Sequence, residues 1–142
     1  MTDYKKYDGP GKAAVRRYLD KLGYFTNAHE SRDVDLTSLT PDDFEPLNHE
    51  VEVKAVWEGE WPEDWKDVRI PKRKGRYTKR SVPVLFWVLR SDLRMTILIK
   101  GSDICDEQIK EVSNSRVRSG EEFYCVPIEL CKFVDLEAPV GD

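Results

Sequence analysis

The chain has 142 residues, of which 39% are hydrophobic and 35% charged, and its net charge is -4 at neutral pH. This length fits one domain that can bury a core. The longest apolar run, residues 82–89, is too short to cross a bilayer, and no apolar segment follows the charged residues near Met1. We therefore expect one cytoplasmic domain over 1–142, with no membrane partner and with frayed tails at 1–8 and 137–142.

The cysteines give no indication of a disulfide framework or a zinc site. Cys105, Cys125 and Cys131 are an odd number and form no CxxC pair. We expect three reduced, partly buried thiols.

The first half of the chain predicts one helix followed by three strands. The helix covers 11–23 and has apolar side chains at i, i+3, i+4 and i+7, namely Val15, Tyr18, Leu19 and Leu22. Short strands are expected at 24–28 and 33–39, followed by a loop at 41–48. From His49 to Trp57, polar residues at 50, 52 and 54 alternate with apolar ones, which is the pattern of a half-buried strand.

The second half predicts an irregular segment and further strands. We expect residues 59–80 to be irregular, 83–89 and 95–99 to form a hairpin, and 106–112 to form a short helix. A last strand is expected over 123–134, bent at Pro127. Together the elements predict the α+β class (α/β in the broad sense).

Charge is segregated along the sequence. Acidic residues dominate between 30 and 64, whereas one acid, Asp67, accompanies eight basic residues between 66 and 80: Lys66, Arg69, Lys72, Arg73, Lys74, Arg76, Lys79 and Arg80. An acidic pocket beside a basic strip suits a metal-dependent phosphodiester enzyme, because carboxylates hold the cation and basic side chains hold the substrate backbone. A solvated charged loop is the alternative interpretation.

Three polar residues form the candidate catalytic set. Glu52 and Lys54 are two apart on a strand and therefore share a face. If the strand of Asp35 pairs beside them, two carboxylates and an ammonium converge. Hard oxygen ligands of this kind suit Mg²⁺ or Mn²⁺, and Lys54 could stabilise developing negative charge or position the attacking water.

At this point the sequence resembles the PD-(D/E)XK nuclease superfamily, on Val34-Asp35-Leu36, on Glu52-Val53-Lys54 and on the helix before them. The resemblance covers roughly the first half of the chain. It implies a restriction-endonuclease-like αβββαβ core, that is, a mixed central sheet flanked by helices, here with extra C-terminal strands. It also implies metal ligation by Asp35 and Glu52, catalysis with Lys54, and Mg²⁺-dependent endonuclease activity on DNA.

The sequence departs from that family pattern in three places. The first helix carries Asp20 where many members have a glutamate, and Val34 stands in place of the proline. The helix expected after Lys54 is interrupted by Pro62, Pro71 and Gly75.

Further candidates surround the catalytic set. Asp33 and Glu50 are secondary acidic candidates, and we expect Asp33 at a solvent-exposed strand entrance and Glu50 at the rim. Five basic residues are candidate nucleic-acid contacts: Arg69, Lys72, Arg73, Lys74 and Arg76. The two histidines, His29 and His49, are expected in surface loops. Trp57, Trp61 and Trp65 could stack on bases, but such aromatics more often cover a core edge.

The function expected from the sequence is structure-directed or weakly sequence-specific cleavage of DNA. RNA as the substrate and a homodimeric arrangement both stay open. The compact, highly charged chain is also typical in composition of phage accessory proteins. Two other classes compete: a non-catalytic nucleic-acid-binding or interaction module with the same fold, and an unrelated α+β protein-binding domain.

Overall fold

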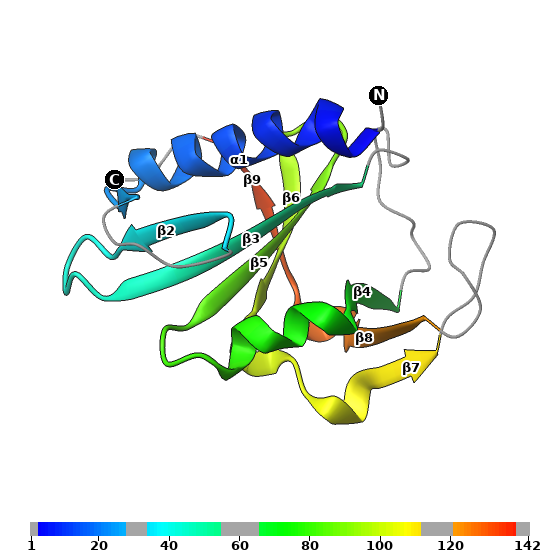
Figure 1. The fold of residues 1–142 in the computed structure, drawn as a ribbon. Coiled ribbons are helices and arrows are strands. Elements are labelled where there is room, and N and C mark those ends of the chain that lie inside the picture. The colour runs from blue at the N-terminus through cyan, green and yellow to red at the C-terminus, as the bar shows by residue number, and fades with distance from the viewer. Residues whose placement is uncertain (1–2, 28–33, 55–65, 112–120, 139–142) are drawn as a thin grey trace.

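The computed structural model describes residues 3–27, 34–54, 66–111 and 121–138, with side chains from residue 9 onward. The helix α1 (Asp3–Lys21) lies over one face of a six-stranded sheet. A three-stranded sheet lies on the other side (Figure 1). The expected α+β class is confirmed at this level. No helix in the described part of the chain is long and apolar enough to cross a membrane.

The larger sheet is mixed. Its strands, in spatial order, are β1 (Phe25–Thr26), β2 (Leu36–Leu39), β3 (Pro46–Lys54), β5 (Val84–Arg90), β6 (Met95–Lys100) and β9 (Lys132–Asp135). All neighbours are antiparallel except β3 and β5, which run parallel. The predicted hairpin is confirmed as β5–β6. The loop expected at 41–48 ends earlier, because β3 begins at Pro46.

The helix α1 is longer than the sequence pattern indicates. Residues 3–8, where the sequence predicts a frayed tail, belong to the helix, and Pro10 lies inside it. Proline has no backbone N–H, so it loses no helical hydrogen bond at the first turn and loses one inside a helix. The sequence alone does not show which of these two positions Pro10 occupies. Gly11 brings α1 close to β3, since a Cβ there would lie 2.6 Å from a methyl group of Val53.

Alternation along β5 assigns the two faces of the larger sheet. Trp87 and Leu89 belong to the core beneath α1, together with Val15, Leu19, Leu36 and Val51. Phe86 and Val88 belong to the opposite core, shared with the smaller sheet. Because β3 pairs in parallel with β5, Val51 faces α1 with Trp87, and Glu50 faces the smaller sheet with Phe86.

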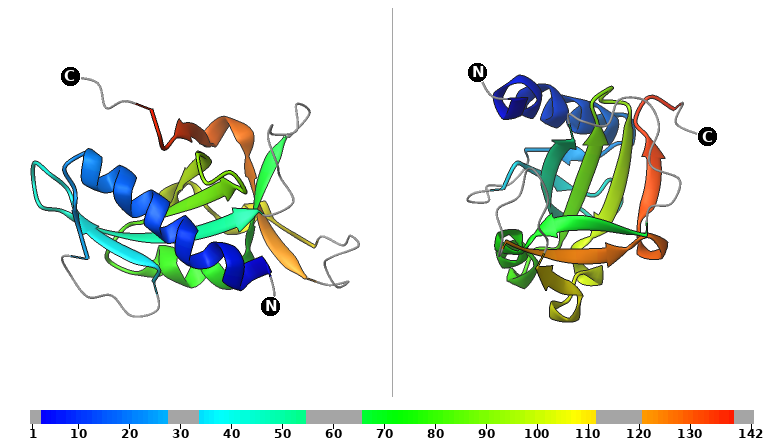
Figure 2. Two further views of the ribbon diagram at one scale, coloured as in Figure 1. Left: turned by 90° about the horizontal axis from the view of Figure 1, so that it is seen from above. Right: turned by 90° about the vertical axis from the view of Figure 1, so that its right-hand side faces the viewer.

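The smaller sheet consists of β4 (Asp67–Pro71), β8 (Glu122–Pro127) and β7 (Ile109–Glu111), in the order β4-β8-β7. Its strands run crosswise to those of the larger sheet (Figure 2). The 3₁₀ helix η1 (Lys72–Lys79) follows β4. The expectation of an irregular segment over 59–80 is therefore wrong for 67–79, because Val68 and Ile70 alternate with charged residues and are fully buried.

Two other expectations in the second half are corrected. The helix expected at 106–112 is a single 3₁₀ turn, Asp106–Gln108, followed by β7, because the Gln108 side chain closes a capping box within three residues. The single strand expected over 123–134 is two strands in different sheets. They are separated by the 3₁₀ turn Ile128–Leu130, which starts after Pro127.

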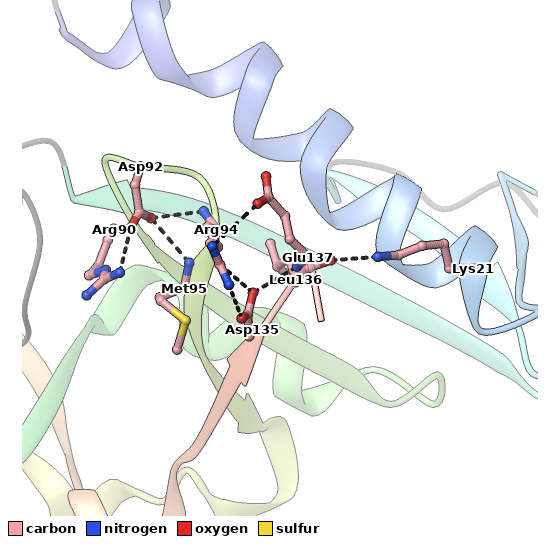
Figure 3. A network of polar contacts seen from close by, with 8 residues as sticks. All are labelled: Lys21, Arg90, Asp92, Arg94, Met95, Asp135, Leu136 and Glu137. Carbon is pink, nitrogen blue, oxygen red and sulfur yellow. Dashed lines mark hydrogen bonds and ion pairs between the residues drawn. The ribbon is translucent and has the colours of Figure 1, made fainter. Parts of the chain in front are cut away.

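Polar contacts tie β9 to the β5–β6 turn and to α1 (Figure 3). The Arg94 guanidinium donates two hydrogen bonds to the Asp135 carboxylate, at 3.0 and 2.9 Å. These bonds hold the pKa of Asp135 below its usual value. Lys21 Nζ donates to the backbone oxygen of Leu136 at 3.0 Å. Residues 137–138 continue from this anchored segment, and 139–142 lie outside the described residues.

All three cysteines are free, but the expectation of partly buried thiols is wrong for Cys105. Cys105 is exposed, Cys125 is buried and Cys131 is half-buried. Burial, together with the negative charges of Asp103, Glu129 and Asp67, raises the pKa of the Cys131 thiol to about 11. Protonated thiols are weak nucleophiles, so Cys131 is a packing residue.

Gly75 is required for the position of η1 against β8. A Cβ at Gly75 would lie 2.1 Å from the Tyr124 hydroxyl oxygen and 2.9 Å from Cζ, and Tyr124 is only 4% exposed. We therefore expect Gly75→Ala to lower the free energy of unfolding by about 1–3 kcal/mol, measured by urea denaturation. Gly9→Ala is the matched control, since a Cβ there meets no atom within 4 Å. Equal stability of the two variants would contradict the close packing of η1.

Candidate functional site

Two carboxylates meet where β2 begins to pair with β3. Asp35 lies in a bend just before β2, and its backbone N–H donates to Glu50 Oε2 at 2.9 Å. The Asp35 Oδ2 atom accepts a hydrogen bond from the backbone N–H of Val51 at 2.8 Å. The two acidic residues are thus bound to each other's segments by reciprocal hydrogen bonds, and their relative position is fixed by the backbone.

A lysine from another element faces each of these carboxylates. Lys12 Nζ, from α1, is 3.3 Å from Asp35 Oδ1. Lys74 Nζ, from η1, is 3.6 Å from Glu50 Oε1, and the Lys74 side chain is only 14% exposed. Elements on both sides of the larger sheet therefore contribute to one polar cluster, which consists of Asp35, Glu50, Lys12 and Lys74.

Glu50 is the most buried acid of the cluster, at 5% exposure. Burial raises the pKa of its carboxyl group, and the negative charge of Asp35 raises it further. Lys74 and the bond from the Asp35 N–H lower the pKa but do not cancel these effects. The expectation that Glu50 sits at the rim is wrong, because β3 is an inner strand and Lys74 of η1 reaches Glu50 on this face.

Glu52 and Lys54 lie two and four residues after Glu50 on β3, so their side chains share its face. Their side chains pair with each other, with Lys54 Nζ 3.0 Å from Glu52 Oε1. Both are partly exposed, at 31% for Glu52 and 26% for Lys54. The partner of Asp35 across the strands is thus Glu50, whereas Glu52 belongs to a second, more open pair.

A buried amide lies on the same face. Asn48 precedes Glu50 by two residues on β3 and is 1% exposed. Its Oδ1 atom is buried and accepts no hydrogen bond in the described structure. A buried oxygen without a donor is costly, and such atoms are found where another group completes the site. Nothing in the sequence pattern distinguished Asn48, because it lay in the predicted loop.

The buried His49 forms a different network on the α1 face. Its Nδ1 accepts a hydrogen bond from Trp87 Nε1 at 3.0 Å, and its Nε2 is 2.7 Å from Ser38 Oγ. Because the indole nitrogen can only donate, the neutral imidazole carries its proton on Nε2 and donates it to Ser38. This tautomer cannot accept the serine proton, so the pair is not a nucleophile and base. The expectation of a surface loop is wrong for His49, which is fully buried.

The five basic candidates have different surroundings. Lys74 points to Glu50, as described, and Arg69 Nε is 3.9 Å from Asp67 Oδ1. Lys72 Nζ is 3.1 Å from Glu122 Oε1 at the surface. Arg73 and Arg76 are exposed on η1. Asp33, His29, Trp57, Trp61 and Trp65 lie outside the described residues.

The donor set allows a test of the expected Mg²⁺ or Mn²⁺ ion. No group of three or more His, Cys, Asp or Glu side chains converges among the described residues. Mg²⁺, however, is commonly held by one or two carboxylates, with water and substrate phosphates as the other ligands. Asp35 and Glu50 provide two carboxylates, and Asn48 provides a buried amide oxygen nearby on the strand. These residues fit such an ion as hard oxygen donors.

No known protein family matches the chain. No curated protein matches it either. The functional argument therefore depends on the geometry of the Asp35–Glu50 cluster.

Proposed function

We propose that the protein is a Mg²⁺- or Mn²⁺-dependent endonuclease of the PD-(D/E)XK type that acts on DNA. The observation that carries this proposal is the carboxylate pair of Asp35 and Glu50, joined at 2.9 Å through the Asp35 N–H. Lys54 lies four residues after Glu50, on the same face of β3. A phosphodiesterase needs such a combination of cation-holding acids and a nearby ammonium group.

The order of elements supports the proposed type of core. A helix is followed by three strands, and β5 then pairs in parallel with β3. The segment between β3 and β5 differs from the family pattern, because β4 and η1 occupy its described part where the resemblance implies a helix.

Each residue has a distinct role in the proposed reaction. Asp35 and Glu50 hold the cation, and Glu52 is a third candidate oxygen ligand. When bound, the ion polarises the scissile phosphate and lowers the pKa of a bound water. Lys54 offsets the negative charge that develops on the phosphate, and Lys74 balances the charge of Glu50.

A second candidate function is a nucleic-acid-binding module without catalysis. The observation that favours it is that both carboxylates of the pair already have a lysine, Lys12 at 3.3 Å and Lys74 at 3.6 Å. In this case the lysines complete the cluster, and no divalent ion enters it.

The deciding experiment incubates the protein with labelled single-stranded, duplex and branched DNA, and with RNA, in Mg²⁺, Mn²⁺ or EDTA. We expect metal-dependent cleavage of DNA, reduced about 100-fold or more by Asp35→Asn and by Lys54→Ala. Asp42→Asn, an exposed acid in the β2–β3 turn, is the matched control and should cleave like the wild type.

Each other outcome points elsewhere. Equal cleavage by the wild type, Asp35→Asn and Lys54→Ala would indicate a contaminant and overturn the proposal. Binding of nucleic acid without cleavage in either metal would favour the non-catalytic module. Gel filtration with light scattering in the same buffers tests the homodimer.

A further inference from the structure

The 3₁₀ geometry of η1 places its basic residues on three sides of the helix: Lys72 on one, Lys74 on the second, and Arg73, Arg76 and Lys79 on the third. Such a helix has three residues per turn, so residues three apart lie on one side. The row that begins at Lys74 continues with Tyr77, and Arg80 follows as the C-terminal cap of the helix. Lys74 contacts Glu50, Tyr77 is 4% exposed, and the Arg80 guanidinium lies 5.0 Å from the centre of the Tyr77 ring. This row faces the protein.

A second row contains Arg73, Arg76 and Lys79, and all three residues are exposed. The Arg76 guanidinium is anchored, because it lies 4.9 Å from the centre of the Tyr77 ring and its Nη2 donates to the Tyr77 hydroxyl at 2.8 Å. Neither Arg73 nor Lys79 pairs with a carboxylate among the described residues. The row is therefore a line of three positive charges on one helix.

This row borders an open hollow of ≈ 530 Å³ between η1, β8 and the turn before β7. Four basic side chains line it: Lys72, Arg73, Arg76 and Lys79. Asp106 is the one acidic residue of the lining, and Tyr124 contributes to the wall. Because Lys72 is paired with Glu122, the positive charge of the hollow comes mainly from Arg73, Arg76 and Lys79, and the hollow has room for a ligand larger than a single small ion.

We infer that this hollow binds consecutive phosphates of a nucleic-acid strand. Successive residues of the row are separated by one turn, or about 6 Å, which matches the separation of neighbouring phosphates along an extended strand. Arginine suits this ligand because its planar guanidinium can donate two parallel hydrogen bonds to a phosphate. The inference deepens the proposed function and rests on it for the choice of DNA.

The same helix connects the hollow to the candidate active site. Lys74 of η1 reaches Glu50 from one side of the helix, while its neighbour Arg73 lines the hollow. A strand held by the outward row is therefore kept at a fixed position relative to the Asp35–Glu50 pair. Gly75, packed against Tyr124, holds η1 in that position.

The test measures binding of a short labelled single-stranded DNA by fluorescence anisotropy in EDTA, where metal-dependent cleavage is excluded. Salt is varied between about 50 and 200 mM. The double variant Arg73→Gln/Lys79→Gln removes two charges of the row. Arg16→Gln/Arg17→Gln removes the same charge from the exposed side of α1, across the larger sheet, and serves as the control.

We expect the η1 variant to bind about tenfold more weakly at the middle of the salt range. The slope of log K against log salt should fall by about 1.4, because each lost contact with a single strand removes about 0.7. The α1 control should keep both the affinity and the slope of the wild type.

Wild-type affinity and slope in the η1 variant would overturn the inference. It would also be overturned if polyglutamate, or inorganic tripolyphosphate, displaced the DNA as well as unlabelled DNA does at equal total charge. Displacement by polyglutamate would indicate an acidic protein partner, and displacement by tripolyphosphate would indicate a small phosphate ligand. Loss of binding in the η1 variant without any cleavage by the wild type would sustain the hollow and overturn the nuclease proposal alone.

Discussion

Replacement of Glu50 by glutamine is expected to reduce metal-dependent cleavage about 100-fold or more, and to weaken the pH dependence of folding stability. The first effect follows because an amide oxygen is a far weaker ligand for a hard divalent cation than a carboxylate. The second follows because Glu50 is 5% exposed and its pKa is raised by burial and by the charge of Asp35.

The sign of the stability effect follows from proton linkage. Since the pKa of Glu50 is higher in the folded than in the unfolded chain, the folded state holds the proton more tightly. The stability contributed by protonated Glu50 is complete below the unfolded pKa of about 4.5. It is lost as the pH rises through the folded pKa, at about 1.4 kcal/mol for each pH unit between the two values. Glutamine does not titrate, so the Glu50→Gln variant does not lose stability in this way as the pH rises.

Urea denaturation of the wild type and Glu50→Gln from about pH 4 to about pH 8, which covers the range from an unperturbed to a fully buried glutamate, measures the effect. The stability of the variant relative to the wild type should rise with pH across this window. Glu52→Gln is the matched control, because Glu52 lies on the same strand face but is 31% exposed. A constant difference between Glu50→Gln and the wild type at every pH would contradict the buried, destabilised carboxylate.

The same titration makes metal binding depend on pH. The carboxyl group of Glu50 must lose its proton to ligate a cation, so the raised pKa delays binding to higher pH. Lys74 lowers the pKa of Glu50 through its charge. Its removal in Lys74→Met would move the acid limb of the cleavage profile to higher pH, because the ionised carboxylate loses its nearby positive charge.

The strands that carry clear patterns could be predicted from the sequence. Alternation in β3 and the apolar runs of β5 and β6 identify these strands because each has one or two buried faces. The same alternation places Glu50, Glu52 and Lys54 on one face. It does not decide which acid meets Asp35, because the register between β2 and β3 is set by the turn between them.

The choice between Glu50 and Glu52 depends on a shift of two residues, or about 7 Å along a strand. Asp35 was expected inside a regular strand, but β2 begins at Leu36 and Asp35 lies in a bend. This bend directs the Asp35 carboxylate to the backbone N–H of Val51 and its own N–H to Glu50. Local backbone geometry of this kind leaves no period in the sequence.

The 3₁₀ helix η1 escaped prediction because Pro71 and Gly75 were interpreted as breaks. Pro71 ends β4 and also precedes the helix, and Gly75 allows contact with Tyr124. Three of the basic residues of η1, Arg73, Arg76 and Lys79, are three positions apart, which is the period of the 3₁₀ helix and not of the α-helix. A search for that period in the segment 72–79 would have separated inward Lys74 from outward Arg73 and Arg76.

His49 provides the second large expected effect, on stability instead of cleavage. Replacing it with leucine should lower the free energy of unfolding by about 2–4 kcal/mol, because the buried Trp87 N–H loses its acceptor and the Ser38 hydroxyl loses its donor. Urea denaturation, with the folded fraction checked by near-ultraviolet circular dichroism, measures this loss. Any reduction in cleavage should scale with the folded fraction.

Ser38→Ala separates this structural role from catalysis. Because Nε2 of His49 carries the proton, Ser38 accepts a hydrogen bond from it and is not activated as a nucleophile. The variant should lose about 1 kcal/mol of stability and keep the turnover rate of the folded wild type. A folded Ser38→Ala protein without activity would instead assign the chemistry to a serine and histidine on the α1 face. Such a result would remove the Asp35–Glu50 pair from the reaction.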